Sequence, residues 1–128
     1  RRAAREERSP RTEEVLSPEQ VRALQTAPES VRVEEDLLRY IVAISRTTRD
    51  QRTCAVGVSP RGTQRLFEAV RARAVLSGRE FVTPDDVKRI APAVLAHRLV
   101  LTPDAAVEDV EKRSVIEGVL DAVAVPTV

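Results

Sequence analysis

The stretch Val58-Ser59-Pro60-Arg61 opens the longest helical pattern of this chain, which runs over residues 60–77. A hydroxyl residue followed by proline is a helix start, because the hydroxyl accepts a hydrogen bond from a free N–H group and proline suits the first helical position. Gly78 follows the pattern as a typical C-terminal stop. The stretch therefore predicts a helix capped by Ser59, with an inner stripe made of Leu66, Phe67, Val70 and Ala74.

The same start signal recurs at Ser17-Pro18 and at Thr83-Pro84, and both of these place acidic residues in the first helical turn. The middle start places Arg61 there instead, and a cation at this end opposes the helix dipole at a cost of ~0.3–1 kcal/mol. An arginine beside a helix N-terminus is well suited to meet an anion. The residues alone leave a second interpretation open, in which Arg61 is solvated or pairs with a nearby acid.

Working outward, apolar spacing predicts four more helices, over residues 18–26, 34–49, 84–97 and 111–123. We expect Pro92 to kink or divide the third of these near residues 89–91, and we take Gly118 in the last as a sign of close packing. Residues 51–58 and 102–110 are predicted to be loops. The β-prone residues 98–101 are expected to pair with residues 31–33. The predicted fold class is all-α: a helical bundle of about five helices with at most one very short two-stranded ladder.

Composition limits the choice of function. The chain has 128 residues, a net charge of +1 and 2% aromatic residues, so no global field draws it to nucleic acid or a membrane. No apolar run is long enough to span a membrane. The single cysteine, Cys54, excludes an internal disulfide and favours a reducing, cytoplasmic location. We expect residues 1–14 to be a linker or frayed lead-in, residues 15–126 one domain, and residues 127–128 a C-terminal tail.

The residues of a complete active site are missing from the sequence. It holds no phosphate loop of the G-x-x-x-x-G-K-[ST] kind, and the single His97 has no second histidine or extra cysteine to build a metal site. A Cys54–His97 catalytic pair has only the presence of those two residues in its favour. The chain by itself therefore reads as a binding or regulatory module, with no metal site and no enzyme activity of its own.

The order and spacing of several short segments resemble the C-terminal helical lid of the MoxR branch of AAA+ ATPases. The likeness covers residues 15–126, and the matching segments are residues 15–19, 48–49, 57–61, 78–88 and 94–99. One departure from the pattern is Gly62, where similar lids often carry alanine, and we expect it to loosen the first turn of its helix.

The resemblance implies a role for Arg61 as the second sensor, an arginine that reaches toward the terminal phosphate of ATP, with Ser59 and Pro60 positioning it. A guanidinium suits this role because it stays charged and offers a planar fork of donors. The resemblance also implies a preceding ATPase domain that binds ATP and Mg²⁺, neighbouring subunits in a hexameric ring, chaperone-like remodelling, and partners with von Willebrand factor A domains.

Two alternatives of other classes remain. One is a nucleic-acid-binding module, whose basic stripe would be formed by Arg61, Arg65, Arg71, Arg73 and Arg79. Interleaved acids and the lack of stacking aromatic residues in that stripe argue against it. The other is a stand-alone protein-interaction bundle with no nucleotide role.

Overall fold

The computed structural model describes residues 10–127, so the expectations for residues 1–9 and 128 lie outside the described residues. Residues 10–14 form no helix or strand. The described part confirms the all-α class, with two short strands, β1 and β2, beside the helices. The elements are α1 (Pro18–Thr26), η1 (Ala27–Ser30), α2 (Glu35–Arg49), β1 (Cys54–Val56), α3 (Pro60–Leu76), α4 (Pro84–Leu95), η2 (Ala96–Arg98), β2 (Val100–Leu101), α5 (Pro103–Val107) and α6 (Lys112–Ala122), where η marks a 3-10 helix.

The predicted helix starts are confirmed at all three hydroxyl–proline pairs. Ser17 and Thr83 form capping boxes, in which cap hydroxyl and third-residue side chain each accept a backbone hydrogen bond. Ser59 accepts a hydrogen bond from the Gly62 N–H group at 3.3 Å. A fourth start of the same kind, Thr102-Pro103, begins α5 within residues expected to be a loop, and Ala105 of this short helix is buried. The loop prediction was wrong there because that start signal was overlooked.

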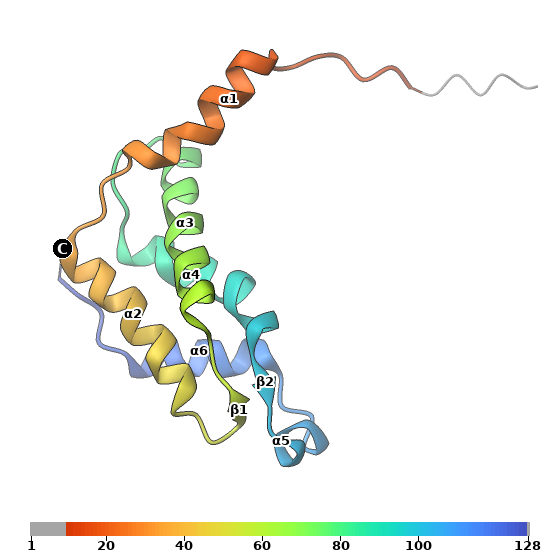
Figure 1. The fold of residues 1–128 in the computed structure, drawn as a ribbon, viewed down its shortest axis with the longest axis vertical. Coiled ribbons are helices and arrows are strands. Elements are labelled where there is room, and N and C mark those ends of the chain that lie inside the picture. Colours follow the sequence, from red (N-terminus) through yellow and green to blue (C-terminus); the bar gives the residue numbers. More distant parts are fainter. Residues whose placement is uncertain (1–9, 128) are drawn as a thin grey trace, which may run out of the picture.

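Four helices enclose the core. Figure 1 shows α3 and α4 crossing at the centre, with α2 on one side and α6 running across one end. Their apolar stripes face inward and exclude water, which is the main source of stability in a bundle of this size. The buried stripe residues are Leu37, Ile41 and Ile44 of α2, Leu66, Val70 and Ala74 of α3, Val87, Ala91 and Leu95 of α4, and Val115, Ile116, Val119 and Leu120 of α6.

The two-stranded ladder exists, but its predicted partners were wrong. β2 pairs antiparallel with β1, with Cys54 opposite Leu101, rather than with residues 31–33. Arg32 instead forms a single parallel bridge to Phe81, in which its N–H group donates to the Glu80 carbonyl at 2.8 Å. Strands of two or three residues carry little pairing information, so the packing of the helices decides which segments meet.

The expected division of α4 at Pro92 does not occur, since the helix runs continuously from Pro84 to Leu95. Proline removes one helical hydrogen bond. Pro92 itself is buried, as are Ala91 and Leu95 beside it. Packing of this face against the core therefore outweighs the missing bond. The helix ends two residues earlier than predicted, and η2 carries the chain from it to β2.

α1 lies at one end of the molecule and extends away from the four core helices (Figure 1). None of its residues is buried, and the adjoining η1 packs against α3. The C-terminal residues return to the start of α2 (Figure 1), where Val123–Thr127 and Tyr40 line one hollow. The described chain is thus a four-helix core with one projecting helix.

Candidate functional site

Arg61 lies in the first turn of α3 and is exposed. Within residues 10–127 its guanidinium takes part in no ion pair and no hydrogen bond with protein, so pairing with a nearby acid is not what the structure shows. Pro60 occupies the first helical position, and the Ser59 carbonyl accepts from the Thr63 N–H group at 3.1 Å. The three residues singled out from the sequence are therefore adjacent at one helix end, with the arginine side chain directed into solvent.

The residue before this cap, Val58, is held by the last turn of α2. Its N–H group donates to Thr48 Oγ1 at 2.9 Å, and its carbonyl accepts from Arg49 Nε at 2.9 Å. Val58 and Thr48 are both fully buried. In the sequence, residues 48–49 stood out only as one of the segments that resemble the family, with no structural role assigned to either. Their spacing of ten and nine residues from Val58 gives no local signal, because the contact joins α2 to the segment that precedes α3.

Glycines allow the close approach of these segments. A Cβ atom on Gly57 would lie 2.7 Å from the backbone of Arg49, so only glycine fits where the chain passes α2. A Cβ atom on Gly62 would lie 2.6 Å from Val58 Cγ1 and 3.2 Å from Arg98 Cδ. Gly62 is buried, and its lack of a side chain leaves room for Val58. The residue therefore belongs to a packed contact, contrary to the expectation that it loosens the turn.

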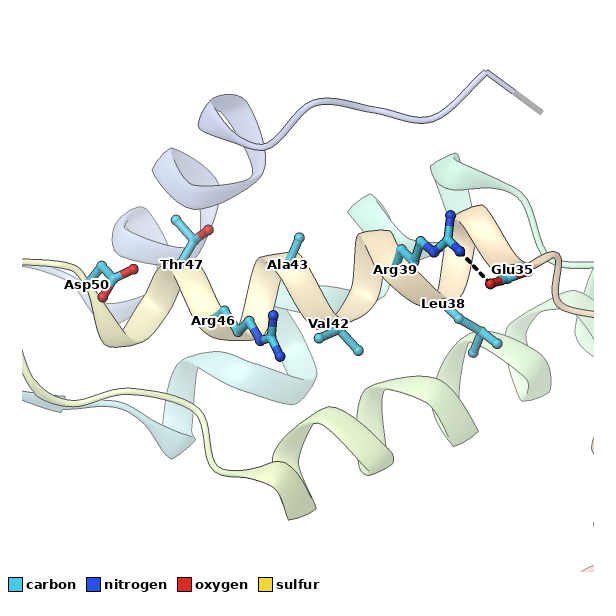
Figure 2. A pocket seen from close by; sticks show the side chains of 8 residues that line it. All are labelled: Glu35, Leu38, Arg39, Val42, Ala43, Arg46, Thr47 and Asp50. Atoms are coloured by element: carbon cyan, nitrogen blue, oxygen red, sulfur yellow. Dashed lines mark hydrogen bonds and ion pairs between the residues drawn. The ribbon is translucent and has the colours of Figure 1, made fainter.

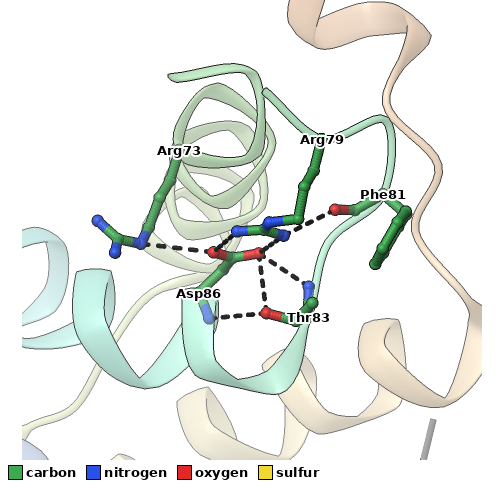
Figure 3. Close-up of polar contacts among 5 residues, drawn as sticks. All are labelled: Arg73, Arg79, Phe81, Thr83 and Asp86. Atoms are coloured by element: carbon green, nitrogen blue, oxygen red, sulfur yellow. Dashed lines mark hydrogen bonds and ion pairs between the residues drawn. The ribbon is translucent and has the colours of Figure 1, made fainter. Parts of the chain in front are cut away.

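A buried ion pair fixes the other end of α3 (Figure 3). Asp86 is only 2% exposed, and its carboxylate accepts two hydrogen bonds from the Arg79 guanidinium, the Nη1 bond measuring 2.7 Å. Arg73 Nε lies 3.4 Å from the same carboxylate, and the Thr83 N–H group donates to it at 2.8 Å. Sequence reasoning identified Asp86 as a helix-start charge and missed both arginines, because neither is near it in the sequence.

The balance of forces on Asp86 keeps it ionised. Burial alone would raise the pKa of this carboxyl, but hydrogen bonds from Arg79 and Thr83 outweigh burial and hold the pKa below its usual range. Because Arg73 is in the last turn of α3 and Arg61 is in the first, the pair lies roughly 20 Å from the cap at 1.5 Å per residue. It joins α3 to α4 and is not part of the arginine site.

The proposed basic stripe is largely occupied by contacts within the protein. Arg65 pairs with Glu68 at 2.9 Å, and the Arg71 guanidinium lies 5.1 Å from the centre of the Phe67 ring. Arg73 and Arg79 face Asp86. Arg61 is the member of the stripe without such a contact among the described residues, which argues against a continuous phosphate-binding surface.

Other candidate chemistry finds no support in the described residues. No group of three or more His, Cys, Asp or Glu residues among them could hold a metal ion. Burial raises the pKa of the Cys54 thiol, which disfavours the reactive thiolate. His97 is exposed in η2. No helix in residues 10–127 is long and apolar enough to cross a bilayer.

The outer face of α2 carries a hollow separate from Arg61. Figure 2 shows Leu38 and Val42, which are 39% and 40% exposed, flanked by Arg39 and Arg46. The residues that line the hollow are Glu35, Leu38, Arg39, Val42, Ala43, Arg46, Thr47 and Asp50. All of them belong to α2 or follow it directly, and Arg61 is not among them.

Comparisons with known proteins agree on one family. The family model described as "AAA lid domain" matches residues 46–119, a range that contains the Arg61 site. The chain is 34% identical over 128 residues to Chaperone MoxR1 of Mycobacterium tuberculosis, with 93% of this chain and 34% of the relative covered. It is 37% identical over 114 residues to the uncharacterized protein YeaC of Bacillus subtilis, with coverages of 89% and 36%.

A solved structure shows the same fold. The structure of a candidate ATPase from Cytophaga hutchinsonii superposes with a TM-score of 0.81 at 26% identity, over 85% of this chain and 36% of that one. The chain thus spans about a third of the length of the relatives it matches. The matched range, the helical architecture and the likeness to MoxR proteins lead to one assignment: the chain belongs to the AAA lid domain family and is a lid of the MoxR type.

Proposed function

We propose that this lid serves an ATP-hydrolysing, chaperone-like AAA+ protein, and that Arg61 is its second sensor, reaching the terminal phosphate of ATP held by a preceding ATPase domain. The observation that carries the proposal is the exposed guanidinium of Arg61 in the first turn of α3, which has no partner among residues 10–127. Val58, just before the cap of this helix, is hydrogen-bonded to α2. The relatives named MoxR and the structure of a candidate ATPase support the wider assignment.

The chemistry follows from charge. Hydrolysis develops negative charge on the transferred phosphoryl group, and a guanidinium placed beside that group stabilises the transition state more than the ground state. Ser59 caps the helix and Pro60 takes its first position, which places Arg61 in the first turn, at the positive end of the helix dipole. Mg²⁺ and the phosphate loop would come from the ATPase domain, and the lid supplies neither.

The proposal extends to the assembly. Lids of this kind would transmit nucleotide state to neighbouring subunits of a hexameric ring in the cytoplasm, with von Willebrand factor A domain proteins as candidate partners. The unburied α1 favours a second function, a protein-interaction module without a nucleotide role. Its apolar residues Val21 and Leu24 are 40% and 49% exposed.

ATP turnover by the full-length protein separates the two functions. Arg61→Ala should lower turnover roughly a hundredfold or more, because one such donor is worth ~2–4 kcal/mol in the transition state. Arg61→Lys should restore only part of the rate, since lysine lacks the planar fork. Arg65→Ala, one turn further along α3, is the matched control. Normal turnover in a well-folded Arg61→Ala protein would contradict the sensor function.

The 128-residue chain offers a simpler check. One charged hydrogen bond contributes ~1.5–3 kcal/mol, whereas micromolar binding needs ~8 kcal/mol. We therefore expect titration calorimetry to detect no micromolar affinity for ATP in the chain alone. Micromolar binding would mean that the lid carries a nucleotide site of its own.

A further inference from the structure

The entry to α3 is fixed by hydrogen bonds that a solvent-exposed turn would not need. Both backbone polar groups of Val58 are satisfied by side chains of two consecutive residues, Thr48 and Arg49, at 2.9 Å each. Buried backbone groups must find partners inside the protein. Here the partners come from a different helix, so the bonds specify where the chain enters α3 relative to α2.

The hydroxyl of Thr48 is itself oriented. It donates its proton to the Ser45 carbonyl at 2.6 Å, which leaves its oxygen lone pairs free to accept from the Val58 N–H group. Thr48 is fully buried, so no alternative partner is at hand in solvent. Serine would preserve both bonds, whereas valine has nearly the same shape and makes neither.

The constraint continues into the first turn of α3. The Val58 side chain fills the space that a Cβ atom on Gly62 would occupy, and Gly57 passes directly over the backbone of Arg49. The backbone on either side of the cap is therefore in close contact, with Arg49 at Gly57 and with Val58 at Gly62. The side chain of Arg61, next to Gly62, is exposed and contacts no partner in the described part of the chain.

We propose that Thr48 and Arg49 are positioning residues for Arg61: by holding Val58 they set the place and direction of the first turn of α3, so that α2 and the arginine move as one body. The inference rests on the proposed sensor function. A transition-state contact depends steeply on placement, and a shift of about 1 Å can cost up to about a hundredfold in rate. Neither residue touches the nucleotide in this scheme.

The test is ATP turnover by the full-length protein carrying Thr48→Val. We expect kcat to fall at least about tenfold, with KM for ATP changed less than about twofold, because the lost interaction acts in the transition state. Thr48→Ser should recover most of the wild-type kcat. Thr47→Val is the matched control, since its half-buried side chain makes no hydrogen bond to any of residues 10–127.

A double variant separates positioning from general damage. If Thr48 acts through Arg61, kcat of Thr48→Val combined with Arg61→Ala should equal that of Arg61→Ala alone. A further drop in the double variant, in proportion to the single effect, would overturn the inference. Should Thr48→Val not fold, Arg49→Lys replaces it in the same comparison, because lysine has no Nε group to donate to the Val58 carbonyl. Arg46→Lys is the control for that variant.

The two proposals fail in different ways. An inert Arg61→Ala contradicts the sensor function and removes the basis for positioning as well. If Arg61→Ala lowers ATP turnover but Thr48→Val does not, only the role of Thr48 and Arg49 is contradicted. The same holds if Thr48→Val and Thr47→Val lower turnover equally.

Discussion

The Val58 side chain fills the space that a side chain on Gly62 would need at the first turn of α3. Val58 Cγ1 lies 2.6 Å from the place that a Cβ atom on residue 62 would take, and both residues are buried. A single methyl group cannot be added at residue 62 unless the valine side chain moves. The contact lies one residue from Arg61, so packing here also bears on the arginine site.

The first prediction is that Gly62→Ala destabilises the chain. Overpacking costs ~1–3 kcal/mol, and the better helix propensity of alanine returns at most ~1 kcal/mol, so we expect a net loss of about 1 kcal/mol in the free energy of unfolding. Adding Val58→Ala should open the space. The double variant should be more stable than the sum of the two single changes by about 1–3 kcal/mol.

Urea unfolding of the four proteins in this cycle measures the coupling. Additive effects within about 0.5 kcal/mol would show that Val58 and Gly62 do not compete for space.

Gly118→Ala should have the opposite sign. Gly118 lies inside α6, is exposed, and has no atom within 4 Å of an added Cβ, so the sequence-based expectation of close packing was wrong. Alanine gains helix propensity there with no steric cost, and we expect the free energy of unfolding to rise by ~0.5–1 kcal/mol. A decrease in the melting temperature of this variant would contradict the structure around α6.

Asp86 should make stability depend on acidity. The pKa of this carboxyl is depressed in the folded state. Its contribution to the free energy of unfolding is therefore fully present above the unfolded pKa of ~3.9, and it is lost as pH falls through the lower folded value. Asp86→Asn should therefore be less stable than wild type at pH 7, and the difference should shrink as pH falls below about 4.

Unfolding by urea between pH 7 and pH 2 checks this behaviour. Asp85→Asn, an exposed neighbour in the same first turn with no ion pair in the described structure, is the matched control. A difference between wild type and Asp86→Asn that stays constant across this range would show that the carboxylate charge contributes nothing.

Arg61→Glu should leave the fold intact and raise its stability by a few tenths of a kcal/mol, because a carboxylate suits the positive end of the α3 dipole. Arg61→Ala should be nearly neutral in the same thermal unfolding experiment. A loss above about 1.5 kcal/mol in either variant would identify Arg61 as a structural residue, contrary to its free side chain.

The sequence by itself determined five of the described α-helices, all except α5, and the starts of α1, α3 and α4. Each long helix of the core has an apolar stripe at the 3.6-residue period, and the cap residues Ser17, Ser59 and Thr83 signal their helices within four residues. Arg61 was identified for the same reason, since its conflict with the helix dipole is local. Such features depend only on neighbours along the chain, so they can be read without a fold.

The tertiary structure alone decided the contacts between distant residues. The pairing of β1 with β2, the bonds from Thr48 and Arg49 to Val58, and the arginines around Asp86 all join separate elements. Pro92 stays helical because its face is buried, and Gly62 is required because Val58 occupies its space. These outcomes depend on how side chains share volume and hydrogen bonds once the helices pack, and a pattern along the sequence does not encode that geometry.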